Sequence, residues 1–211
     1  MKTLGIIAQK GGTGKTTLSV HLAVQATRDG LRVLLLDMDP QASATAWWKR
    51  RRDEHPELIQ ARGDELARIL EQARARNYDL VIADTAPHSS ADSATCAHLS
   101  DHVIIPTRPA ILDLDAIGAT TVIVSEIRAG CAIVLNACPP PKLFGEPHIV
   151  REAREALKHY GLPVSDVAIS QRAALSHALI DGRAVAEFDA DGKAAREIAR
   201  LWDTIKKDMG L

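Results

Sequence analysis

The sequence predicts a single α/β domain in which a mostly parallel, twisted sheet carries helices on both faces. Short apolar segments alternate with helical patterns along all 211 residues. The apolar segments lack a polar face, so each strand has to be covered on both sides, as in parallel sheets. A glycine-rich loop joins the first apolar segment to the first helical one. The length suits one domain, and with 46% hydrophobic but only 3% aromatic residues its core must be aliphatic.

The elements follow from these patterns in chain order. The first helix places Leu18, Leu22 and Ala26 on one face, and Gly30 ends it as a C-terminal glycine does. We expect strands at residues 4–8, 32–37, 80–84, 103–106 and 132–136, and helices at residues 15–29, 43–52, 64–76, 90–99, 114–128, 147–160, 172–181 and 192–209. We expect one domain over residues 1–211, with no room before the first strand for an N-terminal helix-turn-helix domain.

Composition narrows the classes of function. The chain has 26 basic and 27 acidic residues, so nucleic-acid binding would need a local patch and not bulk charge. Three cysteines without metal-ligand spacing favour reduced thiols. The N-terminal apolar run leads straight into the glycine loop, which predicts a buried strand and not a signal peptide. No segment approaches the ~20 apolar residues that span a bilayer. We expect a cytoplasmic protein.

The glycine-rich loop, residues 9–17, reads Gln-Lys-Gly-Gly-Thr-Gly-Lys-Thr-Thr. Its glycines let successive backbone N–H groups point at phosphate oxygens, and the helix N-terminus adds the positive end of its dipole. In such a loop Lys15 reaches the β- and γ-phosphates, and the Thr16 hydroxyl ligates Mg²⁺. The strict pattern G-x-x-x-x-G-K-[ST] fails at Gln9, and the alternative is a glycine-rich turn with incidental lysines. The predicted nucleotide-binding residues are Lys10, Gly11, Gly12, Thr13, Gly14, Lys15, Thr16 and Thr17.

Carboxylates follow two of the expected strands. Asp37 and Asp39 come at the end of the second strand, and Asp84 ends the third. An open parallel sheet binds its ligand at the carboxyl ends of its strands, so these side chains are expected to face the phosphate loop. The alternative for each is a helix N-cap at a strand-to-helix junction.

The loop K-G-G-x-G-K-T-T and the segment D-M-D-P-Q at residues 37–41 resemble the deviant Walker A family, which includes ParA/Soj partition ATPases and MinD. The resemblance covers essentially the whole chain and is strongest to the short, ParF-like ParA proteins. It implies a single-domain P-loop NTPase that hydrolyses ATP slowly with Mg²⁺. In such an enzyme Lys10 reaches across an ATP-sandwich homodimer to the partner's phosphates. The resemblance implies that Lys10, Lys15 and Asp39 are catalytic, with Asp39 orienting the attacking water. Thr16, Asp37 and Asp84 serve the metal, with Asp37 supporting the Mg²⁺ shell and Asp84 holding the ion through a water.

Two further nucleotide contacts follow from the resemblance. Pro109, in the stretch VIIPTRPAILDLD at residues 103–115, is expected to border the nucleotide and the dimer interface. Asn136, which ends the strand at residues 132–136, is a candidate adenine contact. Its alternative is an ordinary polar strand end.

The resemblance also implies partners. The ATP dimer is expected to bind non-specific DNA on the nucleoid and to hydrolyse ATP when a ParB-like protein stimulates it. Whether the dimers assemble into higher polymers stays open. DNA-phosphate contacts would make binding strongly salt-dependent. The alternative is a solvated basic face. The basic run at residues 49–52, behind Trp47 and Trp48, could contact DNA or be an exposed helix end, and the tryptophans are expected to pack on the domain or mark a partner surface. The candidate DNA contacts are Arg172, Arg183, Arg196, Arg200, Lys206 and Lys207.

Two other functions stay open at this point. A MinD-like protein would bind membranes through the apolar stripe of the last helix (Ile198, Leu201, Trp202, Ile205 and Met209), but we expect that stripe to cover the sheet, and so expect no membrane partner. A dethiobiotin-synthetase-like ligase would share the sheet and the loop. We do not expect an iron–sulfur cluster at Cys131 and Cys138, and we interpret His98 and His102 as solvated.

Overall fold

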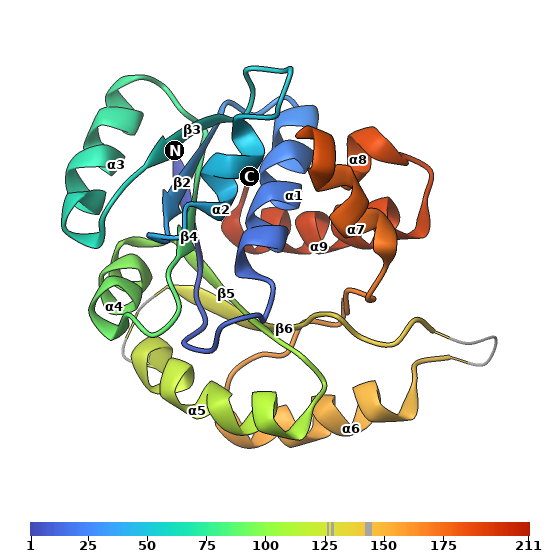
Figure 1. The fold of residues 1–211 in the computed structure, drawn as a ribbon. Helices are drawn as coiled ribbons and strands as arrows, with labels where there is room; N and C mark the ends of the chain where they lie inside the picture. Colours follow the sequence, from blue (N-terminus) through green and yellow to red (C-terminus); the bar gives the residue numbers. More distant parts are fainter. Residues whose placement is uncertain (126, 128, 142–144) are drawn as a thin grey trace.

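The computed structural model describes residues 1–125, 127, 129–141 and 145–211 (Figure 1). Its described strands form one parallel sheet in the order β3-β2-β4-β1-β5-β6. In this order β1 lies between β4 and β5, so the loop that leaves β1 is flanked by the carboxyl ends of both neighbours. The strands are β1 (Lys2–Ile6), β2 (Val33–Met38), β3 (Glu57–Gln60), β4 (Leu80–Thr85), β5 (His102–Thr107) and β6 (Gly130–Leu135).

Helices cover both faces of the sheet, as Figure 1 shows. One buried cluster joins the sheet to α1 (Lys15–Arg28), α2 (Ser43–Trp48), α7 (Ala173–Ala178), α8 (Val185–Phe188) and α9 (Lys193–Met209). The cluster on the other face involves α3 (Leu66–Ala75), α4 (Ser90–Leu99), α5 (Ile111–Ser125) and α6 (His148–Leu157). Single-turn 3₁₀ segments lie at η1 (Gly63–Glu65), η2 (Lys158–Tyr160) and η3 (Leu179–Asp181).

The inner strands β2, β4 and β5 each contribute to both clusters, which explains their continuous apolar sequences. In β2, Val33 and Leu35 face α1 and α9, whereas Leu34 and Leu36 face the side of α3. A two-sided strand of this kind needs helices on both faces. The predicted fold class, a single α/β domain with a parallel sheet, is therefore confirmed.

Element boundaries depart from the prediction in a few places. The five predicted strands are present, but β3 and α8 were missed because they are only four residues long and carry no clear period. The helix expected at residues 43–52 ends at Trp48. The helix expected at residues 114–128 begins three residues earlier, at Ile111, and is described to Ser125. Residues 126 and 128 lie outside the described part.

The last helix packs as a core element. Ile198, Leu201, Trp202, Ile205 and Met209 are all buried in the cluster that contains α1. The indole N–H of Trp202 donates to Asp29 at the end of α1 at 2.8 Å. The expectation that this stripe covers the sheet is confirmed. Within the described residues, no helix combines the length and the apolarity that crossing a membrane requires.

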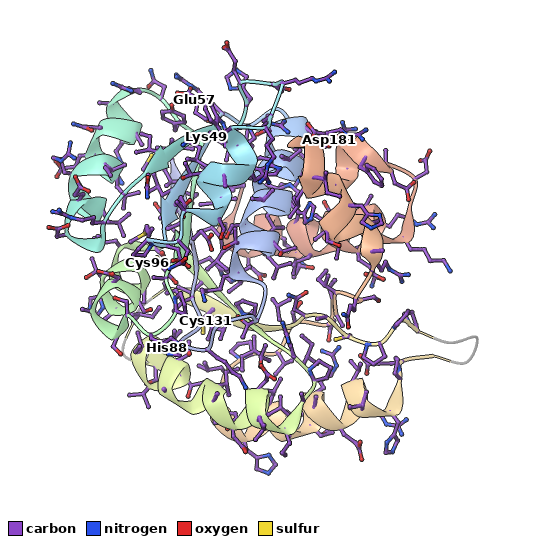
Figure 2. The ribbon with its side chains drawn as sticks, in the orientation of Figure 1. Lys49, Glu57, His88, Cys96, Cys131 and Asp181 are labelled. Atoms are coloured by element: carbon purple, nitrogen blue, oxygen red, sulfur yellow. The ribbon has the colours of Figure 1, made fainter. Side chains whose placement is uncertain are left out.

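Some polar residues lie elsewhere than expected. The prediction of a solvated His102 is wrong, because it lies in β5 with 4% of its surface exposed. The cysteines lie on separate elements, with Cys96 on α4 and Cys131 on β6 (Figure 2). Burial raises the pKa of Cys96 and of Cys138 to about 12, so these thiols stay protonated at neutral pH. Among the described residues no group of three His, Cys, Asp or Glu side chains could hold a metal ion by itself.

Candidate nucleotide site

The phosphate loop connects β1 to α1 at the centre of the sheet. Gly12 and Gly14 adopt φ values of 75° and 95°, a region that only glycine enters freely. A Cβ atom on Gly14 would overlap the side-chain amide of Asn136. That amide donates to the Thr13 carbonyl oxygen at 2.7 Å, so the end of β6 fixes the curve of the loop.

Gln9, which breaks the strict motif, is directed away from the loop's phosphate side. The side-chain amide of Gln9 donates to the Ser93 hydroxyl of α4 at 3.0 Å. The backbone carbonyl oxygen of Gln9 accepts the His88 N–H at 3.0 Å. The residue therefore joins the start of the loop to the segment that follows β4. A glycine at this position would lack that side-chain contact.

A cavity of about 530 Å³ opens over the loop. One end is formed by the loop and α1, and the other by residues 170–179, with Asp39 and Pro87 between them. The lining residues are Gly11, Gly12, Gly14, Lys15, Thr16, Thr17, Asp39, Pro87, Arg108, Asn136, Ala137, Ser170, Gln171, Arg172, Leu175, Ser176 and Leu179.

Lys15 is held at the phosphate end of this cavity. The residue is 6% exposed, and its Nζ donates to the Ala8 carbonyl oxygen at 3.1 Å. Burial lowers the pKa of Lys15, while the carboxylates of Asp84 and Asp39 raise it in part. A buried cation with one hydrogen-bond acceptor suits an incoming phosphate, because an anion would supply the missing partners.

Asp84 and Asp37 are paired in register on neighbouring strands and are both fully buried, but they differ in their partners. Asp37 accepts the backbone N–H and the hydroxyl of Thr45 at 2.8 and 2.7 Å, which ties β2 to the first turn of α2. Neither oxygen of Asp84 accepts a hydrogen bond of ordinary geometry from a described residue. Burial raises the pKa of Asp84 to about 7, against the influence of the nearby Thr16 and Ser19 hydroxyls.

These residues fit a magnesium ion. Mg²⁺ in nucleotide sites takes one or two protein oxygens and completes its shell with phosphates and water. The unpartnered carboxylate of Asp84 and the nearby hydroxyl of Thr16 are such oxygens. Asp37 is occupied by Thr45, so its support of the Mg²⁺ shell stays a prediction.

Asp39 lies at the edge of the cavity. Its Oδ1 accepts the Gln41 N–H at 2.9 Å, and its own N–H donates to Asp37 at 3.3 Å. The residue is half-buried and lines the cavity, so a water in the cavity can reach its carboxylate. The role of this residue in orienting the attacking water stays a prediction that this position permits.

Lys10 lies outside the cavity of its own chain. Its Nζ donates to the Leu112 carbonyl oxygen at 2.9 Å and lies 3.5 Å from Asp113 Oδ1, at the start of α5. Pro109 is buried in the loop before α5 and is not among the cavity-lining residues, whereas its neighbour Arg108 is. The Arg108 guanidinium donates to the Gly12 carbonyl oxygen. Sequence reasoning missed Arg108, although it follows a strand end as Asp39 does.

The candidate DNA contacts separate into two groups. Arg172 pairs with Glu197, Arg183 with Asp181 and Lys206 with Asp29, each at 2.7 or 2.8 Å. Arg172 also lines the cavity. Arg196, Arg200 and Lys207 are exposed on α9 and form no ion pair within the described residues.

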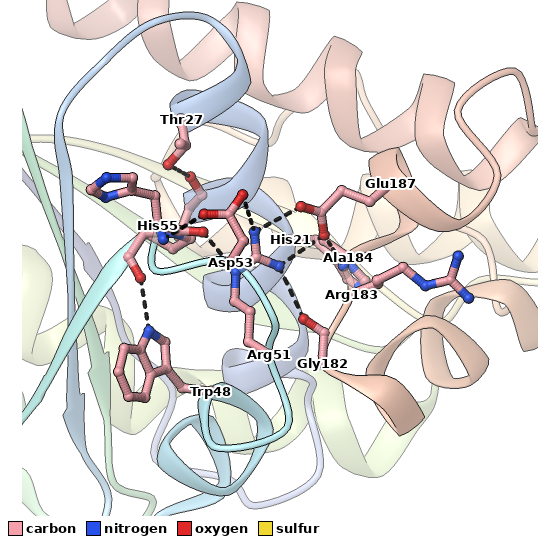
Figure 3. A network of polar contacts seen from close by, with 12 residues as sticks. His21, Thr27, Trp48, Arg51, Asp53, His55, Gly182, Arg183, Ala184 and Glu187 are labelled. Atoms are coloured by element: carbon pink, nitrogen blue, oxygen red, sulfur yellow. Dashed lines mark hydrogen bonds and ion pairs between the residues drawn. The ribbon is translucent and has the colours of Figure 1, made fainter.

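The basic run after α2 contains one structural arginine (Figure 3). The Arg51 side chain is 3% exposed and forms a bidentate ion pair with Glu187, with N–O distances of 2.9 and 2.7 Å. It also donates to the Gly182 carbonyl oxygen at 3.0 Å. Trp47 is buried beside it and Trp48 donates to the Pro56 carbonyl oxygen, so both tryptophans pack on the domain as one of the two expectations had it.

The phosphate loop lies with the buried Lys15 and Asp84 at the carboxyl ends of the central parallel strands. This arrangement defines a P-loop nucleotide-binding protein. Comparison with known proteins agrees: the family of the CobQ/CobB/MinD/ParA nucleotide binding domain matches residues 4–185. The chain belongs to this family and is a P-loop ATPase, with ATP and Mg²⁺ as the ligands that its site fits.

Two relatives are similar to this chain along nearly their whole length. The Maintenance of carboxysome distribution protein A of Gloeobacter kilaueensis is 35% identical, over 99% of this chain and 94% of the relative. The chromosome-partitioning ATPase Soj of Thermus thermophilus is 26% identical, over 97% of this chain and 95% of the relative. Among solved structures, apo McdA of Cyanothece has a TM-score of 0.80 at 17% identity, covering 99% of both chains. The cell division ATPase MinD of Pyrococcus furiosus has a TM-score of 0.77 at 17% identity over 98% of both chains.

Proposed function

We propose that this chain is a positioning ATPase that closes into an ATP-sandwich homodimer, binds non-specific DNA as that dimer, and distributes a cellular cargo along the nucleoid. The observation that carries the proposal is the position of Lys10. A second loop lysine that lies outside its own cavity can reach a nucleotide bound to another copy once it leaves Leu112 and Asp113.

The surroundings of Lys10 support a second copy as its partner. Ile111 and Leu112, next to the Lys10 contacts, are each 71% exposed. Apolar side chains exposed this far beside a charged rim are typical of a surface that becomes buried in a complex. Dimer closure over the cavity would cover them and bring Lys10 to the partner's phosphates.

Hydrolysis in this proposal depends on positioning. Backbone N–H groups of the loop and Lys15 hold the phosphates, the Thr16 hydroxyl and Asp84 hold Mg²⁺, and Asp39 orients the water. Lys10 of the second copy adds positive charge where the γ-phosphate develops negative charge. Since that charge is present only in the dimer, hydrolysis follows association, and a ParB-like partner would accelerate it.

The exposed basic residues of α9 are the DNA contacts that we propose. Arg196, Arg200 and Lys207 have helical spacing that places them on one face, together with the exposed Lys193. This face is opposite the buried stripe of Ile198, Leu201 and Ile205. Phosphates would bind there without sequence preference. The paired residues Arg172, Arg183 and Lys206 are weaker candidates, because each would first have to leave its carboxylate.

The relatives support the proposed role in positioning. One carries a name for carboxysome distribution and another for chromosome partitioning, so the common element is the movement of a large body and not one particular cargo. A nucleoid-associated location in the cytoplasm follows from the proposed DNA binding. A membrane role is not favoured, because α9 uses its apolar stripe in the core.

DNA binding measured with ATP, with ADP and without nucleotide, at two salt concentrations, tests this function. We expect binding of a random duplex only with ATP and Mg²⁺, weakened steeply by salt, and lost in Arg196→Glu/Arg200→Glu with ATP binding intact. Arg68→Glu/Arg74→Glu, which reverses two exposed charges on α3, is the matched control. Binding that does not depend on nucleotide would contradict the switch, and unchanged binding by the α9 variant would contradict the DNA surface.

A further inference from the structure

His21 joins the helix that starts at the phosphate loop to the opposite wall of the cavity. It lies on α1, is fully buried, and has one protein partner for each ring nitrogen. Its Nε2 lies 3.1 Å from the Leu175 carbonyl oxygen, and its Nδ1 lies 3.1 Å from the Val185 nitrogen. Figure 1 shows α1 beside the α7–α8 segment that contributes both partners, and Figure 3 shows His21 next to that segment.

These two contacts determine the state of the ring. A backbone N–H can only donate, so Nδ1 accepts from Val185 and Nε2–H donates to Leu175. Burial lowers the pKa of His21 to about 4, so the neutral ring persists at neutral pH. A protonated ring would place an N–H against the Val185 N–H. His21 therefore holds two backbone groups in one arrangement.

The wall that His21 holds lies at the nucleoside end of the cavity. The loop and α1 form the phosphate end, so the rest of a bound nucleotide extends toward Gln171, Leu175, Ser176 and Leu179. The Leu175 side chain lines the cavity while its carbonyl oxygen accepts from His21. Any movement of Leu175 and its helix relative to His21 on α1 thus changes the distance between the phosphate loop and this wall.

We propose that His21 is a positioning residue that sets the spacing between the phosphate loop and the nucleoside-facing wall of the cavity. It raises the affinity for the nucleoside part of the ligand and leaves the affinity for the triphosphate part unchanged. The proposal rests on ATP as the ligand of this cavity and not on dimerisation, DNA binding or cargo. Its failure and that of the proposed function are therefore distinguishable.

Calorimetric titration of the whole chain with Mg·ATP and with Mg·tripolyphosphate tests the proposal. Leucine at position 21 leaves the Leu175 carbonyl and the Val185 N–H without partners. We expect His21→Leu to bind ATP about tenfold more weakly and tripolyphosphate within about twofold of the wild type. His102→Leu, a substitution at a second buried histidine in β5 that does not line the cavity, is the matched control and is expected to keep the wild-type ratio of the two affinities.

A second variant keeps the test decisive if the leucine variant does not fold. His21→Asn retains a donor and an acceptor, but its shorter side chain cannot reach both backbone partners. ATP affinity must again fall more than tripolyphosphate affinity. Equal loss for both ligands, or unchanged ATP affinity in a folded variant, would overturn the proposal, because a role in stability alone does not distinguish the two ligands.

Discussion

The side-chain amide of Asn136 donates to the Thr13 carbonyl oxygen at 2.7 Å, so the residue that follows β6 supports the phosphate loop. The two residues are 123 positions apart in the chain. Gly14 lies against the same amide and has no room for a side chain. The shape of the loop is thus determined by a distant strand as well as by its own glycines.

Gly14→Ala is expected to remove ATP binding while the domain still folds. The added methyl overlaps the Asn136 amide, and the residue must also keep φ at 95°. Gly30→Ala is the matched control, because φ is 88° there but nothing lies within 4 Å of the added Cβ atom. The control should lose about 1 kcal/mol of unfolding free energy and bind ATP normally. Wild-type ATP affinity in Gly14→Ala, measured by calorimetry, would contradict the proposed packing.

Arg51→Met is expected to destabilise the fold strongly. The substitution leaves Glu187 without its bidentate partner and the Gly182 carbonyl without a donor. Removing one member of such a buried pair lowers the unfolding free energy by about 3 kcal/mol. The exposed neighbour Arg52→Met is the control and should change it by less than about 0.5 kcal/mol. Equal urea midpoints for the two variants would refute a structural role for Arg51.

Stability is expected to fall with pH partly through His21. Its folded pKa is about 4, below the ordinary 6.5. Below pH 6.5 the unfolded chain takes up a proton that the folded chain does not, so this contribution is complete above pH 6.5 and is lost as pH falls toward 4. The loss amounts to about 2 kcal/mol at pH 5. Urea unfolding at pH 7.5 and pH 5 should show this extra loss in the wild type and not in His21→Asn. Identical pH dependence in the two proteins would contradict it.

Much of the site could be predicted because its signals are local. The glycine positions and Lys15 form a short motif, and Asp39 and Asp84 each follow an apolar strand. The sequence could not show that two aspartates in similar positions have different partners. Asp37 and Asp84 both lie at strand ends, but Thr45 donates a hydrogen bond only to Asp37.

The remaining differences arise from tertiary contacts. Arg51 belongs to a run of four basic residues, yet it alone is buried against a carboxylate 136 positions away. His102 is hidden by its place in β5, and His21 has its partners on α7 and α8. The four-residue β3 and α8 are too short for a periodic pattern. For Arg51 and His21 the deciding neighbours are distant in sequence, so a local pattern carries no signal of them.

ATPase activity of a mixture of Lys10→Ala and Asp39→Ala tests most directly whether Lys10 acts on the other chain's nucleotide. Each variant alone is expected to be inactive. In a mixed dimer, the site on the Lys10→Ala chain has its own Asp39 and receives Lys10 from the other chain. An equal mixture should therefore recover about a quarter of the wild-type activity. No recovery, with mixed dimers shown to form with ATP and Mg²⁺, would contradict the account.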